Sequence, residues 1–318
     1  MDLSFAPLEG ITSYIFRRAH REMFGGADKY YAPFIAPDSA GKFKAGNLRD
    51  VLPQNNGEIT LVPQILCNAP EPFLAVSREL ADMGYGEVNL NVGCPSGTVV
   101  AKHKGAGMLL DLCSLDNCLA DIFSRCELKV SVKTRLGISS GDEFPAIMEI
   151  YRKYPLSELI IHARTRSGMY KSTPDLSAFA DVLRDSPFPL CYNGNIFSVS
   201  DFENLHAAAE GEYGVMIGRG AAADPALFRE IRGGAALTTK ELRGFHDRLL
   251  SDFLSAGLDA HICMARLKEL WFYWETLLPD CKKQVKAVYK SRRLDDYKSA
   301  VTALFSECQV SSECHFNK

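Results

Sequence analysis

Residues that could carry out chemistry gather around Cys94. The stretch Glu87–Gly93 alternates apolar residues with Asn89 and Asn91, and this period of two predicts a strand with both amides on one face. A glycine and a proline flank Cys94, which predicts a turn that leaves the thiol at the tip of the strand. A basic, glycine-bearing loop, Lys102–Gly107, follows. A lone cysteine is more often an inert packing residue, so the rest of the chain must decide its role.

Polar and basic residues also stand at the ends of other predicted strands. In chain order these ends hold Pro7, Pro33, Gln64, Asn91 with Cys94, Lys133 with Arg135, His162 with Arg164, Asn193-Gly194-Asn195, and Gly218-Arg219-Gly220. The glycines of the last two ends let backbone N–H groups approach an anion, and Arg219 adds charge, which predicts a phosphate site. Lys133 could stabilise the N1/O2 edge of an anionic reduced flavin, and Gln64 could hydrogen-bond its pyrimidine edge. Together with the phosphate site, these residues suit flavin mononucleotide (FMN). Taken alone, Lys133 could be an ion-paired lysine and His162 a hydrogen-bonded core histidine.

The elements that must position these residues alternate regularly along the chain. The predicted strands are Leu3–Leu8, Lys29–Ile35, Leu61–Leu66, Glu87–Gly93, Lys129–Arg135, Glu158–Arg164, Leu190–Ile196 and Tyr213–Gly218. The predicted helices are Tyr14–Met23, Glu71–Met83, Asp116–Cys126, Phe144–Tyr154, Leu176–Asp185 and Ser200–Glu210. Eight such strands predict a (β/α)₈ TIM barrel. A doubly wound sheet would normally show Gly-x-Gly-x-x-Gly after the first strand, where this chain has Pro7-Leu8-Glu9-Gly10. The polar segment Asp38–Glu58 is expected to be a loop.

After Gly233-Gly234 no further strand is predicted. Apolar residues recur at helical spacing from Lys240 to Cys308, which predicts a small all-α domain. We therefore expect a barrel domain of residues 1–234 and a helical domain of residues 235–318. In the second, Lys282–Lys298 carries seven Lys and Arg against two Asp, so it is either a surface for phosphates or a solvated helix face.

Composition sets the class of protein. The 318 residues are 47% hydrophobic and 24% charged with a net charge of −3, as expected for an ordinary globular protein. Ten scattered cysteines without C-x-x-C spacing argue against a zinc site, an iron–sulfur site or a disulfide framework, so we expect reduced thiols and no structural metal. No secretory signal or apolar membrane span is visible, and we expect a cytoplasmic monomer that does not bind membranes.

At this point the motifs resemble those of the tRNA-dihydrouridine synthases. The resemblance runs from residue 3 to about 231. It is carried by Ala6-Pro7-Leu8-Glu9-Gly10-Ile11-Thr12, Asn89-Leu90-Asn91-Val92-Gly93-Cys94-Pro95 with Lys104-Gly105-Ala106-Gly107, Val132-Lys133-Thr134-Arg135, His162-Ala163-Arg164-Thr165-Arg166, Asn193-Gly194-Asn195-Ile196 and Ile217-Gly218-Arg219-Gly220. The segment around Cys94 is the most specific. The resemblance implies an FMN-binding barrel followed by a helical RNA-binding domain.

The resemblance also implies roles for the site residues. Cys94 would be the general acid. FMN would be held by Pro7, Leu8, Gln64, Lys133, His162, Asn193, Gly194, Asn195, Gly218 and Arg219. Substrate RNA or its uridine would contact Asn91, Lys102, Arg135, Arg164, Arg166, Lys282, Lys283 and Lys286. No residue is assigned to a metal.

The implied reaction is the reduction of specific tRNA uridines to 5,6-dihydrouridine. NADPH would reduce FMN, hydride would pass from N5 to C6 of the uracil, and Cys94 would protonate C5. An unperturbed thiol, with a pKa of about 8.5, is mostly protonated at neutral pH and can donate that proton. The target base must leave its stack to be reached. The alternatives are an enzyme of free pyrimidines similar to dihydroorotate dehydrogenase, a synthase acting on ribosomal RNA, and an RNA-binding protein that keeps the barrel as a scaffold.

Overall fold

A computed structural model describes residues 1–38 and 41–311 of the chain. Its contacts divide the chain into two compact units. The first unit consists of Met1–Pro7, Asp28–Asn195 and Glu203–Ile217. The second unit consists of Leu8–Ala27, Ile196–Phe202 and the described residues from Gly218 onward.

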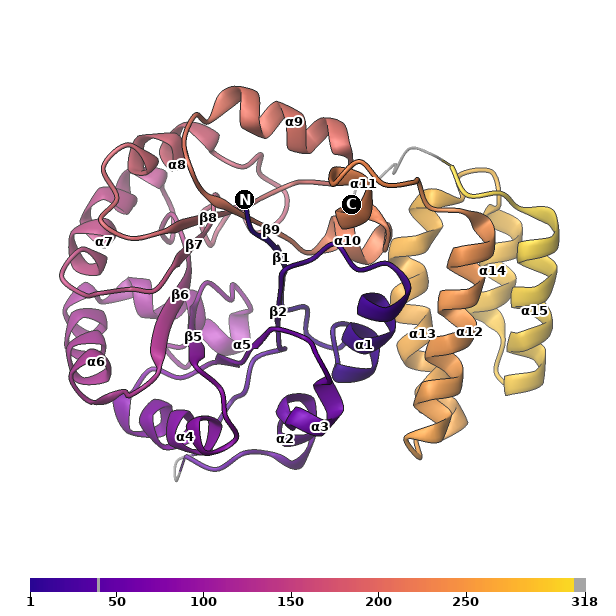
Figure 1. Cartoon of the computed structure of the whole chain (residues 1–318), viewed down its shortest axis with the longest axis horizontal. Coiled ribbons are helices and arrows are strands. Elements are labelled where there is room, and N and C mark those ends of the chain that lie inside the picture. Colours follow the sequence, from indigo (N-terminus) through magenta and orange to yellow (C-terminus); the bar gives the residue numbers. More distant parts are fainter. Residues whose placement is uncertain (39–40, 312–318) are drawn as a thin grey trace. The chain divides into compact units, whose positions relative to one another are not determined.

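The first unit is a parallel barrel. Its strands are β1 (Leu3–Phe5), β2 (Lys29–Tyr31), β3 (Leu61–Val62), β4 (Gln64–Ile65), β5 (Glu87–Val92), β6 (Lys129–Arg135), β7 (Leu159–His162), β8 (Leu190–Asn193) and β9 (Gly214–Ile217). In the described part of the chain all nine strands are parallel, in the order β3-β2-β1-β9-β8-β7-β6-β5-β4. Figure 1 shows the strands as an inner ring with helices outside.

The first and last strands of this order, β3 and β4, are separated along the chain only by Pro63. β3 pairs with β2 on one side, β4 pairs with β5 on the other, and Pro63 lies between them in the chain. Proline has no N–H to donate, which interrupts the ladder. The carbonyl of Pro63 still accepts from the N–H of Asn89 at 2.9 Å. β3 and β4 are therefore two halves of the predicted third strand, and the predicted TIM barrel is confirmed.

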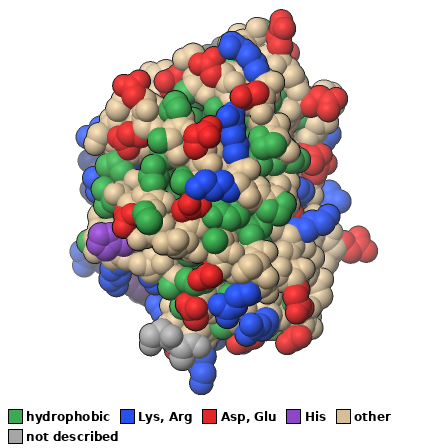
Figure 2. Space-filling view, turned by 90° about the vertical axis from the view of Figure 1, so that its left-hand side faces the viewer, with side chains coloured by type: hydrophobic (Ala, Val, Ile, Leu, Met, Phe, Trp, Pro, Cys, Tyr) green, Lys and Arg blue, Asp and Glu red, His purple; other side chains and the backbone are tan. Residues whose placement is uncertain are grey.

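Helices cover the outside of the strands. Within the first unit they are α2 (Ala45–Val51), α3 (Pro53–Asn56), α4 (Pro70–Asp82), α5 (Gly97–Val100), the 3₁₀ helix η1 (Gly105–Leu110), α6 (Leu112–Arg125), the 3₁₀ helix η2 (Gly141–Glu143), α7 (Phe144–Tyr151), α8 (Leu176–Leu183) and most of α9 (Val199–Ala208). Acidic, basic and hydrophobic side chains are interspersed on the face that carries α6 and α7 (Figure 2), as on an ordinary solvated surface.

The expectation of a loop over Asp38–Glu58 is wrong for most of its length. Residues 39–40 lie outside the described part of the chain, but α2 and α3 occupy much of the rest. The side chain of Val51 is fully buried, and Asn56 donates to the carbonyls of Asp50 and Leu52 at 3.0 Å. Burial of Val51 and local hydrogen bonds from Asn56 therefore stabilise two short helices in a segment whose polar composition gives no periodic signal.

The second unit is helical, as predicted for the tail. It contains α1 (Tyr14–Met23), α10 (Arg219–Ala223), α11 (Leu227–Ile231), α12 (Thr239–Ser255), α13 (Ala260–Trp274), the 3₁₀ helix η3 (Glu275–Leu277), α14 (Lys282–Lys290) and α15 (Leu294–Glu307). Trp271 and Trp274 are fully buried, which confirms that the aromatic stripe of the tail is core.

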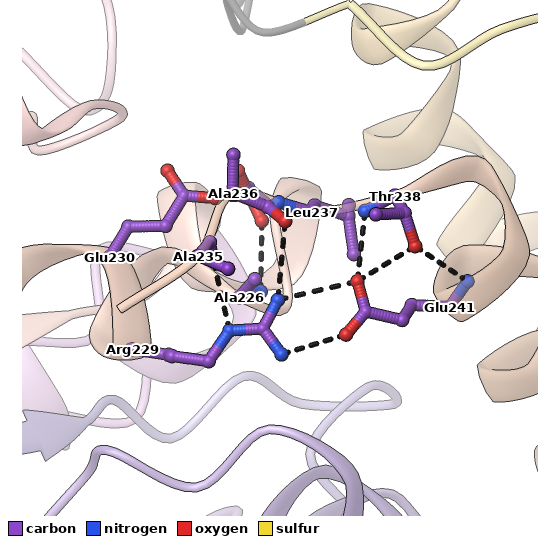
Figure 3. A network of polar contacts seen from close by, with 9 residues as sticks. Ala226, Arg229, Glu230, Ala235, Ala236, Leu237, Thr238 and Glu241 are labelled. Carbon is purple, nitrogen blue, oxygen red and sulfur yellow. Dashed lines mark hydrogen bonds and ion pairs between the residues drawn. The ribbon is translucent and has the colours of Figure 1, made fainter. Parts of the chain in front are cut away.

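Hydrogen bonds and an ion pair hold the segment after Gly233-Gly234 in place (Figure 3). The guanidinium of Arg229 donates to the carbonyl of Ala235 at 2.9 Å and pairs with Glu241 at 2.8 Å. The carboxylate of Glu241 also accepts from the N–H of Thr238 at 2.9 Å, which closes a capping box at the start of α12. The hydrogen bond from Arg229 lowers the pKa of Glu241 to about 2. α11 and α12 are thus joined by a fixed connection.

A buried polar chain runs through the helical core. Trp271 Nε1 donates to Tyr297 Oη at 2.9 Å, and Tyr297 Oη lies 2.8 Å from His246 Nε2. Since the indole can only donate, the phenol proton goes to His246 Nε2, and His246 Nδ1–H donates to Asp247 at 2.9 Å. Burial lowers the pKa of His246 and favours this neutral imidazole.

Tyr297→Phe should lower the free energy of unfolding by about 2 kcal/mol, because it leaves the indole N–H and the imidazole nitrogen buried without partners. Urea unfolding measures the change. Tyr289→Phe is the matched control, because the Tyr289 hydroxyl makes no hydrogen bond to any described residue, and it should change stability by less than about 0.5 kcal/mol. An equal loss of stability in Tyr297→Phe and Tyr289→Phe would contradict the hydrogen bonds assigned to Trp271, Tyr297 and His246.

One pair of cysteines departs from the expectation of reduced thiols. Cys281 and Cys308 form a disulfide across 27 residues, with their Cα atoms 6.2 Å apart. Cys281 precedes α14 and Cys308 follows α15, so the bond closes the pair of helices that carries the basic run. Sequence spacing alone could not show that these two residues meet. Residues 1–38 and 41–311 contain no helix long and apolar enough to cross a membrane.

Candidate active site

Strand register brings the predicted polar residues of the barrel into neighbouring positions. Gln64 on β4 pairs with Asn89 on β5, and Asn89 pairs with Ser131 on β6. Two residues further along, Asn91 pairs with Lys133. Arg135 then pairs with His162, and His162 with Asn193 on β8. Because side chains alternate along a strand, these residues share the inner face of the barrel toward its carboxyl end.

The inner amides form a continuous hydrogen-bond chain. Asn89 donates to Ser131 Oγ at 3.0 Å, Gln64 donates to Asn89 at 2.8 Å, and Asn91 donates to Gln64 at 2.8 Å. Asn91 Oδ1 then accepts from the backbone N–H of Gly93 at 3.1 Å and of Cys94 at 2.9 Å. The turn that carries the thiol is therefore held from the barrel interior.

The two ends of this amide chain fix its direction. Backbone N–H groups can only donate, so Asn91 must present its oxygen to the Cys94 turn and its nitrogen to Gln64. The same reasoning orients Gln64 and Asn89 in turn. Ser131 Oγ–H ends the chain by donating to the carbonyl of Val88 at 3.4 Å. No amide of the chain can reverse alone.

The Cys94 side chain is half-buried beside the glycine-bearing loop. A Cβ placed on Gly105 would come within 2.9 Å of Cys94 Cβ and of its carbonyl oxygen, and Gly105 has φ +56°. The N–H of Ala106 donates to that same carbonyl at 3.0 Å. Only glycine fits here, which explains why Lys104-Gly105-Ala106-Gly107 accompanies the cysteine motif.

Lys133 is held by an amide whose orientation is also fixed. Its Nζ donates to Asn193 Oδ1 at 2.7 Å, while Asn193 Nδ2 donates to the carbonyl of Met216 at 2.8 Å. Burial lowers the pKa of Lys133 to about 7, and the positive charge of Arg135 acts in the same direction. The ammonium therefore gains from any negative charge brought beside it.

Arg135 clamps two segments at the carboxyl end of the barrel. Its Nε donates to the carbonyl of Gly93 at 2.8 Å, and its Nη1 donates to the carbonyls of Thr165 at 2.9 Å and Met169 at 3.1 Å. Its guanidinium carbon lies 5.7 Å from the ring centre of Tyr170. Arg135 is fully buried, so it links the Cys94 turn to the loop after β7.

His162 is oriented by a neighbouring arginine. Arg164 Nη1 lies 3.1 Å from His162 Nε2, and arginine can only donate, so this nitrogen accepts and Nδ1 carries the ring proton. Arg164 Nε also donates to the carbonyl of Ser172 at 2.6 Å. Arg164 is only 2% exposed, and these two interactions connect it to His162 and to the loop. Its predicted RNA contact stays a prediction.

The glycine-rich end after β9 has its own geometry in the second unit. A Cβ on Gly220 would come within 1.9 Å of the carbonyl oxygen of Ile196, so a glycine is required where these two segments meet. The guanidinium carbon of Arg219 lies 5.5 Å from the ring centre of Phe197. Glycine backbone N–H groups beside an arginine are the chemistry that a phosphate group needs.

The remaining predicted residues differ in accessibility. Lys102 and Asn195 are exposed, and the Nε of Arg166 is buried without a hydrogen-bond partner among the described residues. Pro7, Leu8 and Gly194 are partly buried, and Gly218 is buried. In the helical unit Lys282, Lys283 and Lys286 are exposed on α14 and form no ion pair with a described residue.

Sequence reasoning missed three residues of the site and left Asn89, which it placed on the same strand face as Asn91, without a role. Asn89 and Ser131 complete the amide chain, and each stands two residues before a predicted site residue on the same strand face, a signal that was available. Met169, with φ +46°, and Tyr170, which is 45% exposed, complete the loop beside Arg135 and His162. The ring centres of Tyr170 and His162 are 5.9 Å apart. Nothing in the local sequence marks these two residues.

A parallel barrel with polar side chains and a thiol at its carboxyl end is the architecture of a barrel enzyme. A model of the dihydrouridine synthase (Dus) family matches residues 4–307. The chain therefore belongs to the dihydrouridine synthase family, which confirms the resemblance of its motifs.

Three bacterial relatives show the extent of the similarity. The probable tRNA-dihydrouridine synthase 2 of Bacillus subtilis (strain 168) is 30% identical over 268 residues, covering 80% of this chain and 77% of that protein. The probable tRNA-dihydrouridine synthase of Staphylococcus epidermidis (strain ATCC 12228 / FDA PCI 1200) is 32% identical over 234 residues, covering 71% and 70%. A Staphylococcus aureus (strain N315) protein of the same name gives the same identity and coverage.

Proposed function

We propose that this chain reduces uridines of tRNA to 5,6-dihydrouridine, with bound FMN and with NADPH as reductant. The observation that carries the proposal is the Cys94 turn, which Asn91 holds beside the strand position of Lys133. The turn presents a proton donor, and the neighbouring strand presents a cation. Reduction of a carbon–carbon double bond conjugated to a carbonyl needs a proton donor at one carbon and a hydride at the other.

The donor set of the site fits FMN. Lys133 Nζ and the amides of Gln64 and Asn91 offer N–H groups suited to the carbonyl-rich pyrimidine edge of the flavin. Gly218, Arg219 and Gly220 suit its phosphate, since glycines let backbone N–H groups approach an anion and Arg219 adds positive charge. The bound flavin would supply the hydride that C6 of the uracil receives. Pro7, Leu8, His162, Asn193, Gly194 and Asn195 complete the set that we assign to the cofactor.

The protein's own groups would do the rest. Cys94 would give its proton to C5 of the uracil, and Asn91 would keep the turn in place while offering its remaining N–H to the base. Arg135 would hold the Cys94 turn and the loop of Tyr170 together. Lys102, Arg164 and Arg166 lie on segments that follow the same strands, and we assign them to the RNA.

The purified chain tests this proposal. With NADPH, FMN and an unmodified tRNA transcript it should form dihydrouridine, which nucleoside mass spectrometry detects and primer extension maps. Dihydrouridine in ribosomal RNA alone would change the substrate. Reduction of free pyrimidines without any modified RNA would overturn the proposal in favour of an enzyme of free bases.

Reversing three charges on α14 should weaken RNA binding. We assign Lys282, Lys283 and Lys286 of the proposed helical domain, residues 235–318, to RNA phosphates. Lys→Glu at all three should lower tRNA affinity at least tenfold near 0.1 M salt, and should flatten the plot of log affinity against log salt by about two to three units. Filter binding at several salt concentrations measures both.

The control for this experiment changes the net charge equally at other exposed cations. Arg49→Glu, Arg78→Glu and Lys129→Glu together place the same charge on the barrel. This variant should keep most of the affinity and the wild-type salt slope. Equal losses in the two triple variants would show that overall charge, and not α14, governs binding.

A further inference from the structure

A pocket of about 480 Å³ opens on the helical unit between η3 and α14. Its apolar wall consists of Leu278, Pro279 and Val285, and its polar rim contains Lys282, Lys286 and Tyr289. This volume lies within the range of about 300–1,000 Å³ that is typical of sites for small molecules. The pocket is therefore large enough for one nucleotide and larger than an inorganic ion needs.

The rim residues share one face of α14. Lys282, Lys286 and Tyr289 are spaced i, i+4 and i+7, which places them on one side of a helix, and Val288 is buried on another side. In the described part of the chain neither lysine forms an ion pair and the Tyr289 hydroxyl forms no hydrogen bond. Tyr289 remains 37% exposed. These groups are thus available to a ligand rather than used in folding.

The combination of two lysines, an aromatic ring and a carboxylate favours one class of ligand over others. Two lysines beside an aromatic ring match a phosphate joined to a flat base, because bases stack on aromatic side chains and lysines attract the backbone. Glu275 also lines the pocket, and its carboxylate can only accept when ionised. An amino group of a base is compatible with such an acceptor, as carboxylates accept from such groups in nucleic-acid recognition. An acidic peptide would meet this carboxylate with repulsion.

We propose that this pocket binds one nucleotide of the substrate RNA, other than the uridine that is reduced. Its base would stack on Tyr289 with its amino group toward Glu275, and its phosphates would contact Lys282 and Lys286. The identity of the ligand as RNA rests on the proposed function. The pocket would give the helical unit a point of base recognition in addition to the general attraction of its basic helix.

Paired substitutions in the full chain test the proposal with a tRNA transcript as probe. Tyr289→Leu keeps apolar bulk but removes the ring, and should weaken tRNA binding about tenfold, within the range of alanine substitutions at stacked bases. Phe272→Leu removes another exposed aromatic ring, 40% exposed on α13 and outside the pocket, and should bind as wild type. Lys286→Gln should weaken binding more than Lys290→Gln, which lies on the same helix outside the pocket.

Kinetics separate this proposal from the proposed function. In Tyr289→Leu the KM for tRNA should rise about tenfold while kcat and the KM for NADPH stay unchanged. Wild-type tRNA affinity in Tyr289→Leu, or a raised KM for NADPH with unchanged tRNA affinity, would overturn the assignment. If the wild-type chain bound tRNA without forming dihydrouridine, the proposed reaction would be wrong. If Tyr289→Leu weakened that binding and Phe272→Leu did not, the result would still support the proposed pocket.

Discussion

Cys94→Ala should lower the rate of dihydrouridine formation by about 10²- to 10⁴-fold, the usual contribution of a positioned general acid. In the proposed reaction the Cys94 thiol is the proton donor, and alanine removes the proton without enlarging the side chain next to Gly105. Bound flavin and tRNA affinity should stay at wild-type levels, because Asn91 holds the turn through backbone N–H groups. Single-turnover kinetics with a tRNA transcript measure the rate.

Cys113→Ala is the matched control for this change. Cys113 is an exposed free cysteine on α6, and its loss should leave the rate unchanged. Cys94→Ser should retain part of the activity, since a hydroxyl is a weaker acid in the same place. If Cys94→Ala reduced tRNA at the wild-type rate with flavin bound, another group would have to protonate C5.

Lys133→Met should lower the same rate by about 10²- to 10³-fold, the effect of removing one group that stabilises developing negative charge. The remaining activity should also lose its dependence on pH near neutrality. Burial lowers the pKa of Lys133 to about 7, so in the protein without a ligand the lysine is charged below pH 7 and loses its proton as the pH rises. Affinity for an anionic partner should therefore fall with rising pH in wild type and not in the variant.

Unfolding of the flavin-free protein checks the same pKa without catalysis. The unfolded chain keeps the Lys133 proton up to its ordinary pKa of 10.5, whereas the folded chain releases it near 7. Between these values the unfolded state binds more protons, so the stability of wild type relative to Lys133→Met should rise with pH, by at most about 1.4 kcal/mol per unit. Parallel stability curves for wild type and Lys133→Met would contradict the lowered pKa.

The barrel was predictable because its strands carry their own signal. Alternation in Glu87–Gly93 and apolar runs elsewhere marked each strand, and parallel pairing then placed Gln64, Asn91, Lys133 and Asn193 on one inner surface. Helix starts were less exact. α6 begins at Leu112, before the predicted Asp116, because Asp111 caps it by accepting from the N–H of Ser114.

Other features depend on contacts between distant segments. The amide chain needs the register that sets Asn89 against Ser131, and the role of Tyr170 needs a loop bent by Met169 in the left-handed region. The Cys281–Cys308 bond joins residues whose partnership no spacing rule could select among ten cysteines. The sequence motifs pointed to Arg135 and Arg164 as ligand contacts, but only the structure shows that both also hold the loop after β7.

Because the direction of the amide chain is fixed, the barrel interior presents mainly hydrogen-bond donors to a ligand. Asn91 Oδ1 is already shared by two backbone N–H groups, and Gln64 and Asn89 each use their oxygen on the next amide. Each of these three side chains also keeps one amide N–H that none of these bonds uses. Together with the ammonium of Lys133, the barrel interior is a donor-rich surface that matches rings bearing several carbonyl oxygens, as uracil and the flavin pyrimidine do, and mismatches the amino-bearing edge of cytosine.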